Sequence, residues 1–406
     1  MSANTNAKGI ISWDKKFPII IPFFLIALFL YSMGHAGFLG HMGEEYAHFV
    51  HEPNVHYILM LAGLWFFFLR LGAEIEISDV ISAGPLVIAA TLGGVFVPMF
   101  LTTSLVYFIG GVTTLAIALY ASAGSMATDV PMALGSARSV QKSVVAVMLT
   151  ALMILAVGDD LIGVIAMTGL FAEGFDQFDA LAIEAVILLG CWIVGKRGDV
   201  AVKEMDGDRE VNRKIIDFTF ESPVFWIALA VLNTYYLGRN GIEPILGGCL
   251  PLIFAPSAVK HLVAEKTESL ALWLLLAFAL VAGAVDVLSP EAWGIFTLLA
   301  LIGGFGGKVL GIGVGGYIGR RYASPDGEYG VRNFSNQSLI GMAIAGACNG
   351  TVAIIFVSVA ESKGLIPLEL GAQMKIGFLL TVPASYLLNK LLGMLWEETP
   401  DSLAAR

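Results

Sequence analysis

Charged residues are scarce in this sequence. They make up 14% of the chain, against about 25% in an average soluble protein. Hydrophobic residues make up 57%, and the mean hydropathy is +0.80. No polar stretch is long enough for a soluble domain, because the longest one, residues 196–217, is a charged connector. The composition therefore predicts an all-α integral membrane protein.

Cysteines and basic clusters are also scarce. The three cysteines, Cys191, Cys249 and Cys348, fall in apolar stretches and have neither a disulfide pattern nor the spacing of metal ligands. The net charge is −10, and no basic patch with interleaved aromatic residues occurs outside the connectors expected on the cytoplasmic side, which argues against nucleic-acid binding. We therefore expect no cofactor and no nucleic-acid partner.

Apolar windows long enough to cross a bilayer recur along the whole chain. A helix needs about 20 such residues, and we expect about twelve spans, at 17–37, 57–73, 83–109, 113–138, 143–171, 178–195, 222–237, 240–257, 268–287, 290–318, 336–361 and 369–393. They form one transmembrane domain, residues 17–393, between an N-terminal tail, residues 1–16, and a C-terminal tail, residues 394–406.

Lysine and arginine gather in alternate connectors between these windows. If the N-terminus is cytoplasmic, nearly all bases outside the spans fall on the cytoplasmic side, as the positive-inside rule requires. This predicts an even number of spans with both termini in the cytoplasm. The connector 74–82 differs, because it carries Glu74, Glu76 and Asp79 and no base.

Four ionisable residues interrupt the apolar windows. Asp159 and Asp160 lie between two apolar runs, Asp129 follows Thr128 in the fourth window, and Lys308 is isolated in a glycine-rich window. Ionisable groups at membrane depth are costly and are by default candidates for an ion pathway. Paired carboxylates can bind either a proton or a metal cation, and this competition is the simplest form of antiport.

Two windows also contain helix-breaking residues. Pro131 follows Asp129 in the fourth, and the eleventh contains the run 346–352, GACNGTV. Such breaks at corresponding places in two halves indicate a secondary-transporter site, and the halves would be repeats at about 83–171 and 290–393. If the breaks meet, Asp129 is a candidate to offset the positive helix ends and Lys308 the negative ends.

Three stretches resemble the NhaA-type bacterial Na⁺/H⁺ antiporters: 127–135 (ATDVPMALG), 158–161 (GDDL) and 307–311 (GKVLG). The resemblance implies twelve helices in inverted repeats, with broken helices four and eleven crossing. Asp160 and Asp159 would carry Na⁺ or Li⁺ and protons, with Thr128 near the cation. Asp129 and Lys308 would balance charge, and Lys308 would pair with Asp159.

The same resemblance implies electrogenic exchange in the bacterial inner membrane, with two protons entering for each Na⁺ or Li⁺ expelled and a role in pH and sodium homeostasis. The chain also departs from the family. Glu74 and Glu76 stand where an acid–base cluster for pH response is usual, and Asn349 precedes Gly350 where the family usually has Gly-Phe-Thr. Asn349 is therefore a candidate polar group of the cavity.

The remaining charged groups are interpreted as peripheral. Arg70 could pair with Glu74 one turn later, and Glu184, Glu243 and Asp286 are interpreted as surface or vestibule charges. The first external loop is histidine-rich and is interpreted as a solvated interfacial loop. This loop could contact a second subunit of a homodimer, and the alternatives are an external pH sensor or a weak metal site. The histidines are His35, His41, His48, His51 and His56.

Three other functions stay open. A sodium-coupled organic-anion symporter could share broken helices, but it would not need paired aspartates with a lysine. An intramembrane aspartyl protease would use Tyr-Asp and Gly-x-Gly-Asp, and this chain has no Tyr-Asp pair and lacks the first glycine before Asp159. An antiporter selective for K⁺ would have the same residues.

Overall fold

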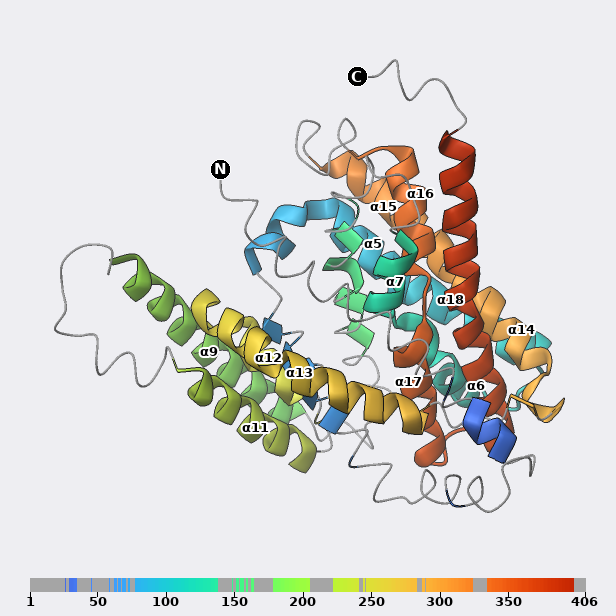
Figure 1. Cartoon of the computed structure of the whole chain (residues 1–406), viewed down its shortest axis with the longest axis horizontal. Helices are drawn as coiled ribbons and strands as arrows, with labels where there is room; N and C mark the ends of the chain where they lie inside the picture. Colours follow the sequence, from blue (N-terminus) through green and yellow to red (C-terminus); the bar gives the residue numbers. More distant parts are fainter. Residues whose placement is uncertain are drawn as a thin grey trace. The chain divides into compact units, whose positions relative to one another are not determined.

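The computed structural model describes residues 77–137, 178–204, 222–240, 246–282, 290–323 and 334–397 continuously. It also describes isolated positions before 77, between 148 and 163, and at 244, 287 and 288. These residues form helices and no strand (Figure 1), so the prediction of an all-α protein is confirmed for this part of the chain.

The described residues form two compact units. Unit 1 contains those of Met1–His51, Ser82–Gly163 and Ala282–Arg406, and unit 2 contains those of Glu52–Ile81 and Val164–Val281. Both predicted repeats fall in unit 1, apart from residues 164–171. Their division into inverted halves stays a prediction.

Within the described residues, three continuous helical stretches are long and apolar enough to cross a membrane: Gly84–Ile109, Ile295–Tyr322 and Leu368–Trp396. They correspond to the predicted spans 83–109, 290–318 and 369–393. Shorter apolar helices occur elsewhere in the described residues. The multi-pass membrane character agrees with the prediction, whereas the count of twelve spans stays a prediction.

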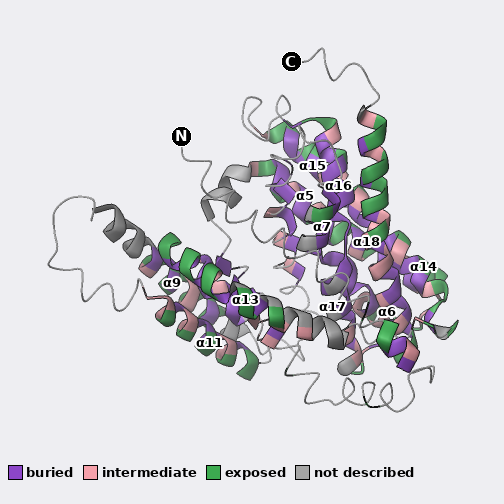
Figure 2. Ribbon diagram, in the orientation of Figure 1, coloured by how far each residue is buried: buried purple, intermediate pink, exposed green. Residues whose placement is uncertain are grey.

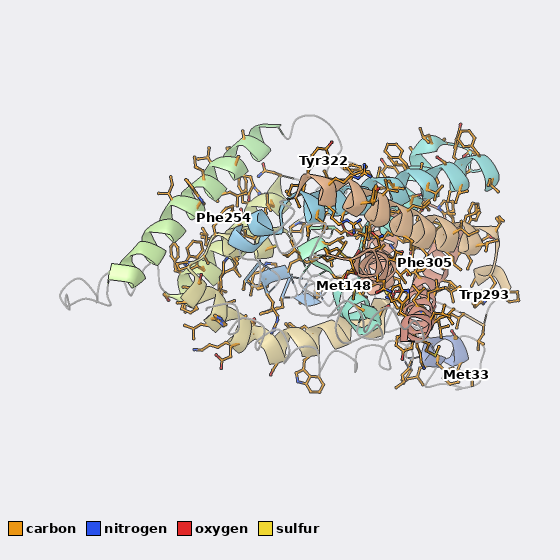
Figure 3. All side chains as sticks on the ribbon, turned by 90° about the horizontal axis from the view of Figure 1, so that it is seen from above. Met33, Met148, Phe254, Trp293, Phe305 and Tyr322 are labelled. Atoms are coloured by element: carbon orange, nitrogen blue, oxygen red, sulfur yellow. The ribbon has the colours of Figure 1, made fainter. Side chains whose placement is uncertain are left out.

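The first two of these stretches pack closely in unit 1. One consists of α5 (Ile77–Ser104) and η2 (Leu105–Ile109). The other consists of α14 (Ile295–Leu301), η6 (Ile302–Gly306) and α15 (Gly307–Tyr322), and it runs between Trp293 and Tyr322 in Figure 3.

The close packing depends on a glycine at every fourth position of the second stretch. A Cβ atom at any of these glycines would overlap α5, so only hydrogen lets the two backbones approach. The contacts run in opposite directions along the two stretches, which are therefore antiparallel. They pair Gly303 with Thr102, Gly307 with Pro98, Gly311 with Gly93, Gly315 with Ala89, and Gly319 with Pro85.

Two helices of unit 1 are interrupted. The pair α6 (Leu115–Ser122) and η3 (Ala123–Met126) is separated from α7 (Val130–Ala137) by residues 127–129. Likewise, α16 (Asn336–Gly346) is separated from α17 (Gly350–Ser362) by residues 347–349. Pro131 falls in the first turn of α7, where a missing backbone N–H disrupts no helical hydrogen bond.

The long helix α18 (Leu368–Glu397) packs against α7, α14, α16 and α17. Figure 2 shows α16 and α17 mostly buried, whereas α18 carries many exposed residues. The interrupted segments therefore lie in the interior of unit 1, where backbone groups that leave a helix can find protein partners.

Unit 2 contains α9 (Phe178–Glu204), α11 (Pro223–Arg239), α12 (Leu246–Ile253) and α13 (Ser257–Ala282). Its apolar core includes Leu69, Trp226, Leu252 and Val259. Among the described residues, the predicted span 240–257 contains α12, whose length at about 1.5 Å per residue is less than a bilayer crossing requires. In addition, α13 begins at Ser257 rather than at residue 268, because the helix continues through charged residues that the hydropathy pattern assigned to a connector.

Candidate ion-binding site

The two interruptions lie directly against each other. The backbone N–H of Asp129 donates to the Cys348 carbonyl at 2.7 Å. The Thr128 hydroxyl lies 3.0 Å from the Gly346 carbonyl, as a donor to it. Residues 127–129 and 346–349 are buried. Each interruption therefore supplies hydrogen-bond partners for the other, which explains how both persist in an apolar interior.

An ion pair lies beside this contact. The Lys308 ammonium donates to Asp159 Oδ2 at 2.8 Å, and both side chains are 0% exposed. The same ammonium donates to Thr128 Oγ1. The single hydrogen of the Thr128 hydroxyl can go to Asp159 Oδ2, at 2.8 Å, in place of the Gly346 carbonyl. The structure thus brings together three of the predicted site residues: Lys308, Asp159 and Thr128.

One oxygen of this cluster remains available. Asp159 Oδ1 is buried and has no hydrogen-bond partner in the described part of the chain. Gly94 on α5 lies close to the carboxylate, since a Cβ there would be 3.4 Å from Asp159 Oδ2. A buried carboxylate oxygen without a donor is costly, and binding a cation or proton would offset that cost.

Asp129 lies between two helix N-termini. Its Oδ1 accepts from the Met132 backbone N–H at 3.3 Å, so it caps α7. Its carboxylate also faces the first residue of α17, because a Cβ on Gly350 would overlap it. Helix N-termini carry about half a positive charge each. The position of Asp129 is the one expected of a residue that offsets two such ends.

Gly350 is required there for two reasons. Its φ of 51° lies in the left-handed region, and an alanine Cβ would overlap the Asp129 carboxylate. We expect Gly350→Ala to destabilise the protein by more than about 1 kcal/mol. Gly135→Ala is the matched control, because Gly135 lies in α7 with open space around it. Thermal unfolding of the purified variants in detergent checks this, and equal shifts for both would contradict it.

Asn349 bonds the carbonyls at the end of η3. Its side-chain amide donates to the Ser125 and Ala127 carbonyls, at 3.0 Å each, and lies 3.4 Å from that of Gly124. Sequence reasoning named Lys308 for the negative helix ends, but the ammonium of Lys308 is bonded to Thr128 and Asp159. Asn349 therefore satisfies the carbonyls at this helix end, and Lys308 pairs with Asp159 instead.

Sequence reasoning missed a polar stripe on α18. Thr381, Ser385 and Asn389 are four residues apart and 0% exposed. Thr381 Oγ1 accepts from the Asn349 backbone N–H at 2.9 Å. Further along, Ser385 and Asn389 bond to the Ser136 hydroxyl of α7, at 2.8 and 2.9 Å. The spacing of four in an otherwise apolar window was the available signal.

Several predicted residues lie outside the described part of the chain: Asp160, Glu74, Glu76, Glu243, Asp286 and the five histidines of the first loop. Arg70 is described, and its guanidinium donates to the Ala264 carbonyl at 3.0 Å. The interpretation of Glu184 as a surface charge is wrong, since its side chain is buried. The hydropathy pattern had placed it near a helix end without showing which face of the helix it occupies.

The chain is similar to known cation/proton antiporters. It is 24% identical over 255 residues to the Na⁺/H⁺ antiporter NhaA of Nocardia farcinica (strain IFM 10152). That alignment covers 59% of this chain, and it spans about half the length, 55%, of the Nocardia protein. No family model matches the sequence.

A solved structure has a similar fold. It is that of the sodium proton antiporter MjNhaP1 from Methanocaldococcus jannaschii at pH 8, with a TM-score of 0.54 at 15% identity. The likeness covers 94% of this chain and 98% of the other, so it extends over both units. The chain is thus similar in sequence to an NhaA Na⁺/H⁺ antiporter and similar in fold to a sodium proton antiporter of known structure.

Proposed function

We propose that this protein is a secondary transporter that exchanges Na⁺ or Li⁺ for protons across the bacterial inner membrane, with both termini in the cytoplasm. The observation that carries the proposal is the buried pair of Lys308 and Asp159 at the contact of two interrupted helices. The likeness to Na⁺/H⁺ antiporters supports the same conclusion.

Energetics favour a functional role for this pair over a purely structural one. Burying two charges costs several kcal/mol per ion, and a well-packed apolar pair is often as stable or more so. Asp159 Oδ1 is also left without a partner. A site that is only partly satisfied is expected where one partner must exchange for another during a transport cycle.

In the proposed cycle, the cation-free state holds Lys308 as ammonium, Asp159 as carboxylate and Asp160 as neutral acid. Na⁺ binds oxygens of Asp159 and Asp160, with Thr128 beside them. Asp160 loses its proton, and Lys308 releases Asp159 and loses another. The state with protons then carries no net charge at these groups, and the state with Na⁺ carries one negative charge. One charge therefore moves in each cycle, as electrogenic exchange of two protons for one cation requires.

Proteoliposomes containing the purified protein and a trapped pH-sensitive dye test the proposal. Addition of Na⁺ or Li⁺ to vesicles with an acidic interior should release protons, and the rate should change with an imposed membrane potential. K⁺ is added separately, because proton release by K⁺ alone would identify the K⁺-selective alternative. Proton movement that requires an organic anion as well as Na⁺ would replace antiport with symport.

A further inference from the structure

Unit 2 contains a buried carboxyl group that the proposed exchange does not use. Glu184 lies on α9 and is only 5% exposed, although Ile183 and Val186 beside it are 51% and 68% exposed. Cys191, seven residues later, is also buried. Glu184 therefore faces inward on the same stripe of α9 as Cys191, whereas its neighbours face outward.

The partner of Glu184 is an amide on α11. Asn233 is 2% exposed, and its Nδ2 donates to Glu184 Oε1 at 2.9 Å. Two further acceptors, Glu184 Oε2 and Asn233 Oδ1, are buried and have no hydrogen-bond partner among the described residues. The pair therefore has one hydrogen bond, and one added hydrogen shared between Glu184 Oε2 and Asn233 Oδ1 would complete it.

A single proton can supply that donor, whereas a metal ion would need more oxygen ligands than this pair offers. One hydrogen on Oε2, donated to Oδ1, satisfies both oxygens and closes a two-bond ring between the carboxylic acid and the amide. Hard metal cations usually take about six oxygen ligands, whereas this pair offers three oxygens. The described residues also contain no group of three or more side chains able to hold a metal.

The titratable groups on the described helices packed against the pair supply no counter-ion. Cys191 lies two turns further along α9, and Cys249 of α12 lies against Gly72. On α11, Tyr236 and Arg239 follow Asn233, and the Arg239 guanidinium is 6.0 Å from the Tyr235 ring. No described lysine, arginine or histidine forms an ion pair with Glu184.

We propose that Glu184 and Asn233 form a proton-binding site in unit 2 that joins α9 to α11. With the proton bound, the acid–amide ring holds the two helices together. When the proton leaves at alkaline pH, a buried carboxylate without a cation remains, and the contact weakens. The site is thus a pH-sensitive contact in unit 2, and it does not depend on the ion exchange proposed for unit 1.

Infrared spectroscopy of the full-length protein in detergent tests this site. The difference between wild type and Glu184→Gln should contain the C=O band of a protonated carboxyl at neutral pH, and raising the pH should convert it to a carboxylate band. Glu265→Gln is the control, because Glu265 is an exposed glutamate of unit 2. That variant should remove only a carboxylate band at neutral pH. A carboxylate band alone for Glu184→Gln would overturn the proposal.

Asn233→Ala provides a second test that does not require Glu184→Gln to fold. Loss of the amide should shift the protonated C=O band of Glu184 to higher frequency, because its hydrogen bond is weaker. An unchanged band would overturn the pairing. Stability should follow the same pattern: wild type should lose melting temperature relative to Glu184→Gln as the pH rises, since the folded protein holds a proton that the unfolded chain releases. A constant difference across pH would also count against the site.

Discussion

Replacing Lys308 with glutamine is expected to lower the stability of the protein by roughly 3–5 kcal/mol and to stop electrogenic exchange. The substitution leaves the Asp159 carboxylate buried without its cation, since the Lys308–Asp159 contact of 2.8 Å is fully enclosed. It also removes one of the two groups proposed to release a proton. Thermal unfolding gives the first effect, and potential-driven Na⁺ uptake into proteoliposomes gives the second.

Two further variants separate charge from titration. Lys308→Arg keeps a cation beside Asp159 but does not deprotonate, so it should retain most of the stability but lose the second proton of the proposed cycle and, with it, electrogenic exchange. Adding Asp159→Asn to Lys308→Gln removes both charges, and it should recover much of the lost stability without recovering transport. If Lys308→Gln keeps wild-type stability and electrogenic exchange, the lysine has neither role.

Asp159→Asn and Asp160→Asn are each expected to abolish cation-dependent proton release. An asparagine side chain neither titrates nor carries the negative charge that attracts Na⁺. Asp159→Asn also leaves the Lys308 ammonium buried without its counter-ion, so its stability is measured beside its transport. Dye-reported proton release in proteoliposomes across about pH 6.5–9 measures the effect.

Glu265→Gln is the control for these variants, because it removes a carboxylate from an exposed position. It should exchange like wild type. Thermal unfolding run in parallel identifies any variant whose loss reflects instability. Normal exchange by either aspartate variant would exclude that carboxylate as an ion carrier.

Linear patterns alone predicted the class of protein and the candidate residues. Long apolar windows require helices in a bilayer, and the described residues are helical. Asp129 and Pro131 marked one interruption, and Asn349 and Gly350 marked the other, because proline, glycine and charge are all unfavourable inside such a helix. The pairing of Lys308 with Asp159 came from the resemblance of motifs, since the two lie 149 positions apart.

Other features were decided only by the tertiary structure, because they depend on rotation about a helix and on contacts distant in sequence. Hydropathy averaged over a window placed Glu184 at the end of an apolar run, but rotation of α9 turns it inward against Asn233. The sequence shows that the segment of α15 is rich in glycine, but it does not show why. In the structure the α5 backbone occupies the space that a Cβ on these glycines would need. Asn349 was predicted to be polar and internal, and only the contact of the two interrupted helices directs its amide to carbonyls more than 200 positions away.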